Sequence, residues 1–237
     1  MLLALSMEGA AADPDAEQLL KSSDVARGGG REGLVWEVEA KNFGTGAKDQ
    51  QDQRLRIKAV DRSSMAEILD PPSDRGMKIL QVDRNMWLTK PGLKKPVSIS
   101  PRQRLTGQAA IGDIAATNYA RDYSAKYLRE ELVDDVPCHV LELTATSHQT
   151  TYDRITYWIS ASNNVAIQAD FLSRSGKSLK LAKFEYGNTV LVHGTTSPFV
   201  SRMSITDALT DERTVLEYSH VKPQPLSSLE FDVDNLQ

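Results

Sequence analysis

The segment LVWEVEAK, residues 34–41, decides how this chain is expected to fold. Apolar and charged residues alternate along it, so that Trp36 and Val38 share one face of an extended strand and the charged residues share the other. The segment RLRIKA, residues 54–59, repeats this polarity. Strands with one apolar and one wet face are typical of an antiparallel sheet that covers a core.

Segments suited to strands follow along most of the chain. They are expected at 65–69, 77–88, 97–100, 124–133, 138–145, 154–160, 165–173, 179–186, 199–205 and 214–221. Turn-forming residues separate them, as in DPPSD at 70–74 and SNN at 162–164. Because such tight turns cannot provide the long crossovers that parallel strands need, the sheet is predicted to be antiparallel.

Two helical segments interrupt the strands. The first follows the N-terminus, where Asp13 suits the N-cap, Pro14 the first helical position, and Gly28 the end of the helix. The second is expected at 111–123, with Asp113 as its cap. A sheet of about ten strands must curl or be covered to hide its apolar face. We therefore expect helices to cover the sheet, with a concave apolar space between them.

Composition limits the classes of function. The chain has 237 residues, of which 40% are hydrophobic and 25% charged, enough for a sizeable core and a soluble surface. The net charge is −4 and no block of Lys or Arg is present, which argues against a nucleic-acid binder. Cys138 is the only cysteine, so an intramolecular disulfide is excluded and a small buried side chain is expected. No run approaches the about 20 apolar residues that a membrane-spanning helix needs.

The N-terminal residues carry the targeting signal of the sequence. Residues 2–7 resemble the end of the apolar part of a signal peptide, and Ala10, Ala11 and Ala12 suit a cleavage site. Residues 1–12 are therefore interpreted as a signal-peptide remnant in preference to a disordered tail. Residues 13–237 are expected to form a single domain.

Several motifs that suggest chemistry are better explained by structure. The run GGGREG at 28–33 fits the dinucleotide-binding pattern, but a helix precedes it and a strand follows, the reverse of the order that this site requires. The run GKS at 176–178 resembles the end of a phosphate-binding loop, yet it lacks the first glycine and leads into a strand. The four histidines share no ligand spacing, and no nucleophile has an evident base. The sequence therefore predicts neither an enzyme nor a cofactor or metal site.

Apolar residues on the predicted strands are the candidates for a ligand cavity. Large rings such as those of Trp36 and Trp87 contribute much contact area at little entropic cost. The full set of candidates is Trp36, Val38, Leu55, Ile57, Met65, Leu80, Trp87, Leu141, Leu143, Ile155 and Tyr157. Ordinary core is the competing interpretation, because core and cavity residues share one sequence pattern.

These motifs together resemble a known family. The stretch LDPPSDRG at 69–76 contains a Pro-x-Asp-x-Gly turn, and a Met-Trp strand at 86–88 follows it. Shorter matches lie at 24–28, 111–114, 122–123, 152–154, 175–177 and 202–203. In order and spacing they resemble the outer-membrane lipoprotein-sorting proteins of the LolA-like superfamily, over roughly residues 15 to 231.

The resemblance implies an incomplete antiparallel β-barrel of about eleven strands, with helices as a lid over a hydrophobic cavity. It also implies a periplasmic, non-catalytic carrier of acyl chains, lipids or lipoproteins. Two alternatives stay open: an adaptor that docks on an envelope transporter without a lipid of its own, and, less favoured, a lipid hydrolase. The identity of the lipid, the partner and the oligomeric state are not given by the sequence.

Overall fold

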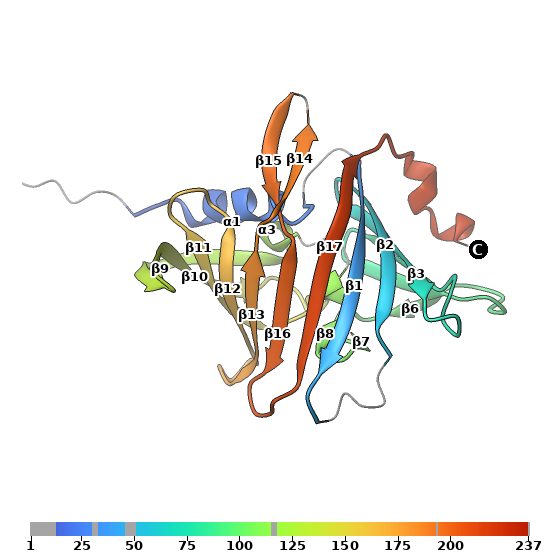
Figure 1. Ribbon diagram of the computed structural model, residues 1–237, viewed down its shortest axis with the longest axis horizontal. Helices are drawn as coiled ribbons and strands as arrows, with labels where there is room; N and C mark the ends of the chain where they lie inside the picture. The colour runs from blue at the N-terminus through green and yellow to red at the C-terminus, as the bar shows by residue number, and fades with distance from the viewer. Residues whose placement is uncertain (1–12, 30–32, 46–50, 115–117, 193, 237) are drawn as a thin grey trace, which may run out of the picture.

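A computed structural model describes residues 13–29, 33–45, 51–114, 118–192 and 194–236 (Figure 1). In this part of the chain the dominant element is one antiparallel sheet of thirteen strands, in the order β6-β5-β4-β3-β2-β1-β17-β16-β13-β12-β11-β10-β9. The expected mainly β fold with an incomplete antiparallel barrel is confirmed, since the sheet stays open between β6 and β9. It has thirteen strands, against the expected number of about eleven.

The strands of this sheet have the following bounds: β1 Leu34–Phe43, β2 Gln53–Val60, β3 Ser63–Asp70, β4 Lys78–Val82, β5 Asn85–Thr89, β6 Val97–Ile99, β9 Tyr123–Val133, β10 Val136–Ala145, β11 Arg154–Ser160, β12 Ala166–Leu172, β13 Ser178–Glu185, β16 Arg202–Asp207 and β17 Arg213–Pro223. Two small hairpins accompany it, β7 Arg104–Thr106 with β8 Ala109–Ala110, and β14 Asn188–Val192 with β15 Thr195–Phe199. The β14–β15 hairpin projects beyond the end of the sheet (Figure 1).

Helices are few and short. They are α1 Ala16–Val25, α2 Ile111–Ile114 and α3 Tyr119–Asp122, followed near the C-terminus by the 3₁₀ turns η2 Ser228–Phe231 and η3 Val233–Asn235. Figure 1 shows α1 and α3 together at one end of the curved sheet, whereas η2 and η3 lie on the other side of β2 and β3. The two groups therefore cover different faces of the sheet.

The two segments with alternating polarity pair as their pattern predicts. In the β1–β2 register Trp36 faces Ile57 and Val38 faces Leu55, and all four side chains are buried. The intervening charged residues lie on the outer face, where Arg56 forms an ion pair with Glu37. The period-2 pattern thus places the apolar residues of both strands on the concave face.

Four local expectations need correction. Residues 77–88 form the hairpin β4–β5, because Asp83, at φ 53°, turns the chain there. The helix expected at 111–123 is replaced by the separate short helices α2 and α3, and Asp113 lies inside α2. The N-cap of α1 is Asp15 instead of Asp13; its carboxylate accepts hydrogen bonds from the backbone N–H groups at positions 17 and 18. The strand expected at 199–205 divides between β15 and β16.

Gly28 ends the first helix as the sequence predicts. Its N–H donates to the carbonyl of Val25, and the N–H of Gly29 donates to the carbonyl of Asp24, the two hydrogen bonds of a Schellman motif. Gly28 adopts φ +92°, and a Cβ built on it would lie 2.8 Å from the indole of Trp36. Both the turn and the close approach of α1 to the sheet therefore require glycine here.

Candidate functional site

The concave face of the sheet is a single apolar interior. Eight of the eleven predicted cavity residues lie in the principal core cluster there: Trp36, Val38, Leu55, Ile57, Leu141, Leu143, Ile155 and Tyr157. Each is at most 1% exposed. Strands from both halves of the sheet contribute to this set, so the curvature of the sheet brings together residues more than a hundred positions apart in the sequence.

The other three predicted residues belong to the outer face. Met65, Leu80 and Trp87 are cross-strand neighbours on β3, β4 and β5, and they pack in a separate cluster with Phe231 and Leu236. Because successive strand residues point to opposite faces, it is their sequence neighbours that contribute to the concave interior. The expectation that Trp87 shares a cavity with Trp36 is therefore corrected.

Helix α1 and the β15 region close one side of the interior. The ring of Trp36 lies beneath Gly28 and contacts Phe199 edge to face, with centroids 5.5 Å apart. On α3, Tyr119 packs edge to face against Tyr157 of β11 at 5.6 Å. Aromatic contacts thus hold the helical cover on the sheet, a role that large rigid rings perform well.

A buried arginine lies within this otherwise apolar space. Arg27 follows α1, is only 5% exposed, and places its guanidinium carbon 4.5 Å from the ring centre of Phe184 and 5.0 Å from that of Tyr119. Its Nη1 donates to the hydroxyl of Tyr157 at 3.3 Å, and its Nη2 lies 4.0 Å from the sulfur of Met203. The groups in direct contact with this permanent charge are therefore neutral aromatic and polar side chains.

Asp24, one helical turn before Arg27, is buried as well. One carboxylate oxygen accepts a hydrogen bond of 2.7 Å from the N–H of Ala120 on α3, and the backbone of Tyr119 also interacts with the carboxylate. Burial raises the pKa of Asp24 from 3.8 to about 7, and the hydrogen bond from Ala120 and the charge of Arg27 offset this only in part. Asp24 therefore links α1 to α3 and titrates near neutral pH.

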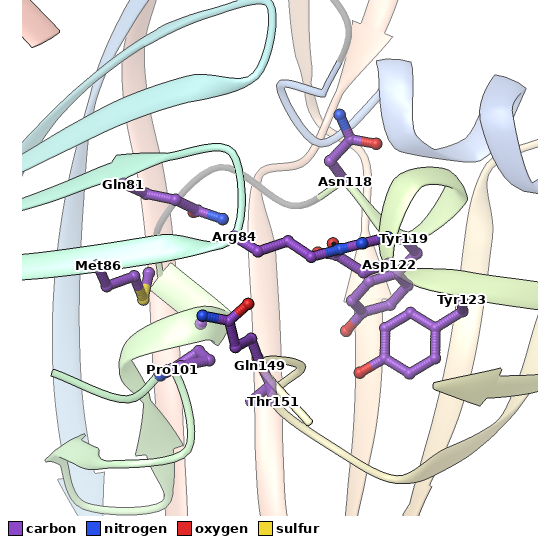
Figure 2. Close-up of a pocket in the computed structure, with 11 residues that line it drawn as sticks. Gln81, Arg84, Met86, Pro101, Asn118, Tyr119, Asp122, Tyr123, Gln149 and Thr151 are labelled. Atoms are coloured by element: carbon purple, nitrogen blue, oxygen red, sulfur yellow. Dashed lines mark hydrogen bonds and ion pairs between the residues drawn. The ribbon is translucent and has the colours of Figure 1, made fainter. Parts of the chain in front are cut away.

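A polar seam joins the β4–β5 turn and the segment after β6 to the end of α3 and the β10–β11 loop, and Figure 2 shows part of it. Arg84, in the β4–β5 turn, reaches across to Asp122 at the end of α3, with Nε 3.3 Å from Oδ1, and to the Thr146 hydroxyl at 3.0 Å. Arg102 donates to the carbonyl of Thr150 at 2.9 Å and to Asp153 at 2.8 Å. Side-chain contacts thus join the β5–β6 side of the sheet to the β10–β11 side. In the described part of the chain, no ladder of backbone hydrogen bonds connects these two sides.

A small pocket opens at this seam, lined among others by Arg84, Asp122 and the rings of Tyr119 and Tyr123 (Figure 2). Its cavity volume of about 20 Å³ holds about one water molecule. An acyl chain could reach the concave interior here only after the seam had opened and the side chains behind it had moved.

In the described residues, the thiol and the candidate metal-binding side chains form no shared site. Cys138 is buried on the outer face in a cluster with Val140 and Trp158, as expected for a small apolar residue, and burial raises the pKa of its thiol. Among the described residues, no three His, Cys, Asp or Glu side chains lie close enough together to hold a metal ion. None of the helices in the described ranges has the length and apolar content to cross a bilayer.

Sequence reasoning missed Arg27, Asp24 and Arg84. The first two lie in the stretch 24–28 that was matched to the family as a motif, but their charges at the end of a helix gave no sign that they would be buried. Arg84 lies within a run expected to be one continuous strand. Aspartate favours turns, so a turn could have been expected at Asp83 and Arg84. That turn would have placed this arginine at the edge of the sheet.

Comparisons with known proteins agree on the fold. A family model described as an uncharacterized protein matches residues 60–237. A LolA superfamily protein from Nitrosomonas europaea shares 32% sequence identity and superposes with a TM-score of 0.79, over 94% of this chain and 99% of that one. The search of curated proteins gave no match.

Two more distant structures show the same fold. One is an outer membrane lipoprotein-sorting protein domain from Vibrio parahaemolyticus, with 18% identity and a TM-score of 0.78 over 93% of this chain and 97% of that one. The other is a DUF1329 family protein from Desulfovibrio piger, with 19% identity and a TM-score of 0.77 over the same shares. At these identities the likeness concerns the fold alone.

Proposed function

Because this chain belongs to the LolA superfamily, we propose that it is a non-catalytic periplasmic carrier that binds an acyl chain, lipid or lipoprotein. One observation carries the proposal: in the described residues a continuous apolar face, curved on itself, is closed along a seam by side-chain contacts and not by strand pairing. Such a seam can open without breaking the sheet.

The energies involved favour this use of the interior. Burying an acyl chain gains about 0.8 kcal/mol per CH₂, so a chain of about fifteen methylenes gains on the order of 12 kcal/mol. Each hydrogen bond across the seam contributes a net of about 0.5–1.5 kcal/mol. Since Arg84 and Arg102 supply most of these contacts, the gain from a bound chain is of the size needed to open the seam, before the ordering of the ligand and the repacking of the side chains are counted.

Native mass spectrometry tests the proposal directly. The unmutated protein, purified from the envelope fraction without detergent, should carry an added mass that matches a lipid and is lost on denaturation. Titration of delipidated protein with dodecanoic acid or with a triacylated lipopeptide should change tryptophan emission saturably. Protein that carries no added mass and responds to neither ligand would refute the carrier function.

The dense packing of the interior favours a second candidate function. With so small a cavity at the seam, the apolar face is also consistent with the core of an adaptor that docks on an envelope transporter. An outer groove of about 360 Å³ beside β1 and β17 offers a surface for such a partner. In its lining Arg56 is paired with Glu37, Lys58 is paired with Glu230, and Lys222 adds a further positive charge. Charge reversal at Lys222 should weaken an adaptor's docking but leave lipid binding unchanged.

A further inference from the structure

The guanidinium of Arg27 has more capacity to donate hydrogen bonds than the described residues use. A guanidinium carries five N–H donors in a planar fork that matches a carboxylate. In the described part of the chain its two hydrogen bonds go to the phenol of Tyr157 and the thioether of Met203, at 3.3 and 4.0 Å. These acceptors are neutral and the contacts are long. Because a buried cation is costly without an opposite charge, this position suits an anion.

Further hydroxyl groups lie around this guanidinium. Tyr157, Tyr186 and Tyr218 all interact electrostatically with Arg27. The hydroxyl of Tyr186 is buried with the backbone of Ala166 beside its oxygen, and no described group accepts its proton. The hydroxyl of Tyr218 lies 3.9 Å from the sulfur of Met203. An oxyanion next to Arg27 could accept hydrogen bonds from phenols as well as from the guanidinium.

The charge is located where a ligand in the proposed interior would meet it. Tyr157, Phe184 and Met203, which contact Arg27, belong to the same apolar cluster as Trp36 and the other concave residues. A ligand lying along this face would thus have its apolar part among aliphatic and aromatic side chains and its polar end beside Arg27. Two buried carboxyls, those of Asp24 and Asp113, interact with the charge of Arg27, but burial raises the pKa of both and favours their neutral forms.

We propose that Arg27, with the hydroxyls of Tyr157 and Tyr186, forms a binding site for the carboxylate of a free fatty acid that binds head first in the concave interior. This inference rests on the proposed carrier function and narrows its ligand. An acyl chain attached to a lipoprotein would enter with its methyl end, and it would bring no anion to Arg27.

Paired ligands isolate the contribution of the carboxylate. Dodecanoic acid and its methyl ester present the same chain, so the ratio of their Kd values reports the anion alone. Below the micellar concentration and at about pH 6, where the acid is ionised and Asp24 mostly holds its proton, wild-type protein should bind the acid at least about tenfold more tightly than the ester, a difference of about 1.4 kcal/mol. The Arg27→Met variant should lose this preference and keep its affinity for the ester.

Two further variants separate ligand binding from a structural role. Arg27→Lys keeps the charge without the planar fork and should retain part of the preference for the acid. Arg84→Met removes a different arginine, at the seam, and should leave the ratio unchanged. If Arg27 only held α1 on the sheet, its replacement would weaken the binding of acid and ester alike, which would overturn the inference. Should Arg27→Met fail to fold, the wild-type ratio and the Arg27→Lys ratio decide.

The remaining outcomes distinguish the inference from the function on which it rests. Equal affinity of the wild-type protein for acid and ester overturns the carboxylate site and supports the carrier function. Binding of a triacylated lipopeptide without binding of dodecanoic acid does the same, and favours a lipoprotein as the ligand. Binding of none of the three ligands overturns the carrier function, and the carboxylate site with it.

Discussion

Replacement of Asp24 by asparagine should change how the stability of the protein depends on pH. In the folded protein burial raises the pKa of this carboxyl from 3.8 to about 7. Between these values the folded state holds a proton that the unfolded state has released. The contribution of Asp24 to stability is therefore fully present below about pH 4 and is lost as the pH rises towards 7.

The size of the effect follows from this difference in pKa. One pKa unit corresponds to about 1.36 kcal/mol, so ionising the buried carboxyl costs about 4 kcal/mol in total. The carboxyl is fully buried and shielded from solvent. Asparagine has a similar shape and can accept the hydrogen bond from Ala120, but it does not titrate.

Urea unfolding, followed by tryptophan emission at several pH values, measures the effect. The free energy of unfolding of wild-type protein minus that of Asp24→Asn should fall by about 4 kcal/mol between about pH 4 and about pH 8. Taking the difference removes the contributions of other acids that titrate in both proteins, among them Asp113, whose pKa burial also raises. A difference that stays constant with pH, or that rises, would refute the assignment of Asp24 as a buried acid that ionises near neutrality.

Four other substitutions have definite expected outcomes. Gly28→Ala should lower the free energy of unfolding by about 1–3 kcal/mol in urea titrations, because its φ is +92° and its Cβ would meet Trp36; an unchanged midpoint would contradict the turn. Arg84→Ala should speed acyl-chain association several-fold in stopped-flow fluorescence by loosening the seam, whereas an unchanged rate would locate the opening elsewhere. Ile57→Ala and Leu80→Ala shorten side chains that are both fully buried, so each should lower the free energy of unfolding by about 2–5 kcal/mol, measured by thermal unfolding. Only Ile57→Ala should alter lipid affinity. Equal effects of the two substitutions on lipid binding would contradict the division into two faces.

The fold was largely predictable because its strands with one wet face obey a strict period of two. On β1 and β2 this pattern gave the correct face for Trp36 and Ile57. The prediction failed where both faces of the sheet are covered, since apolar residues then occupy successive positions. That is the situation on β4 and β5, where Leu80 and Trp87 pack under the C-terminal turns while their neighbours face the interior.

The polar features of the candidate site could not be predicted in the same way. The burial of Arg27 depends on the rings of Tyr119 and Phe184, which lie about 90 and about 160 positions further along the chain and follow no local pattern. Arg84 likewise acquires its role because curvature brings the β4–β5 turn beside α3. Such contacts arise from the closure of the sheet, and the sequence around each residue carries no signal for them.

Spin-label quenching tests the central claim, that a lipid occupies the concave interior, most directly. In the described structure Trp36 lies in that interior, whereas Trp87 and Trp158 belong to clusters on the outer face. Single-tryptophan variants, made by changing the other two residues to phenylalanine, would be titrated with a fatty acid that carries a nitroxide on its chain. Saturable quenching of the Trp36 protein, with little quenching of the Trp87 protein, is the predicted result. Equal quenching of both, or quenching of Trp87 alone, would contradict the claim.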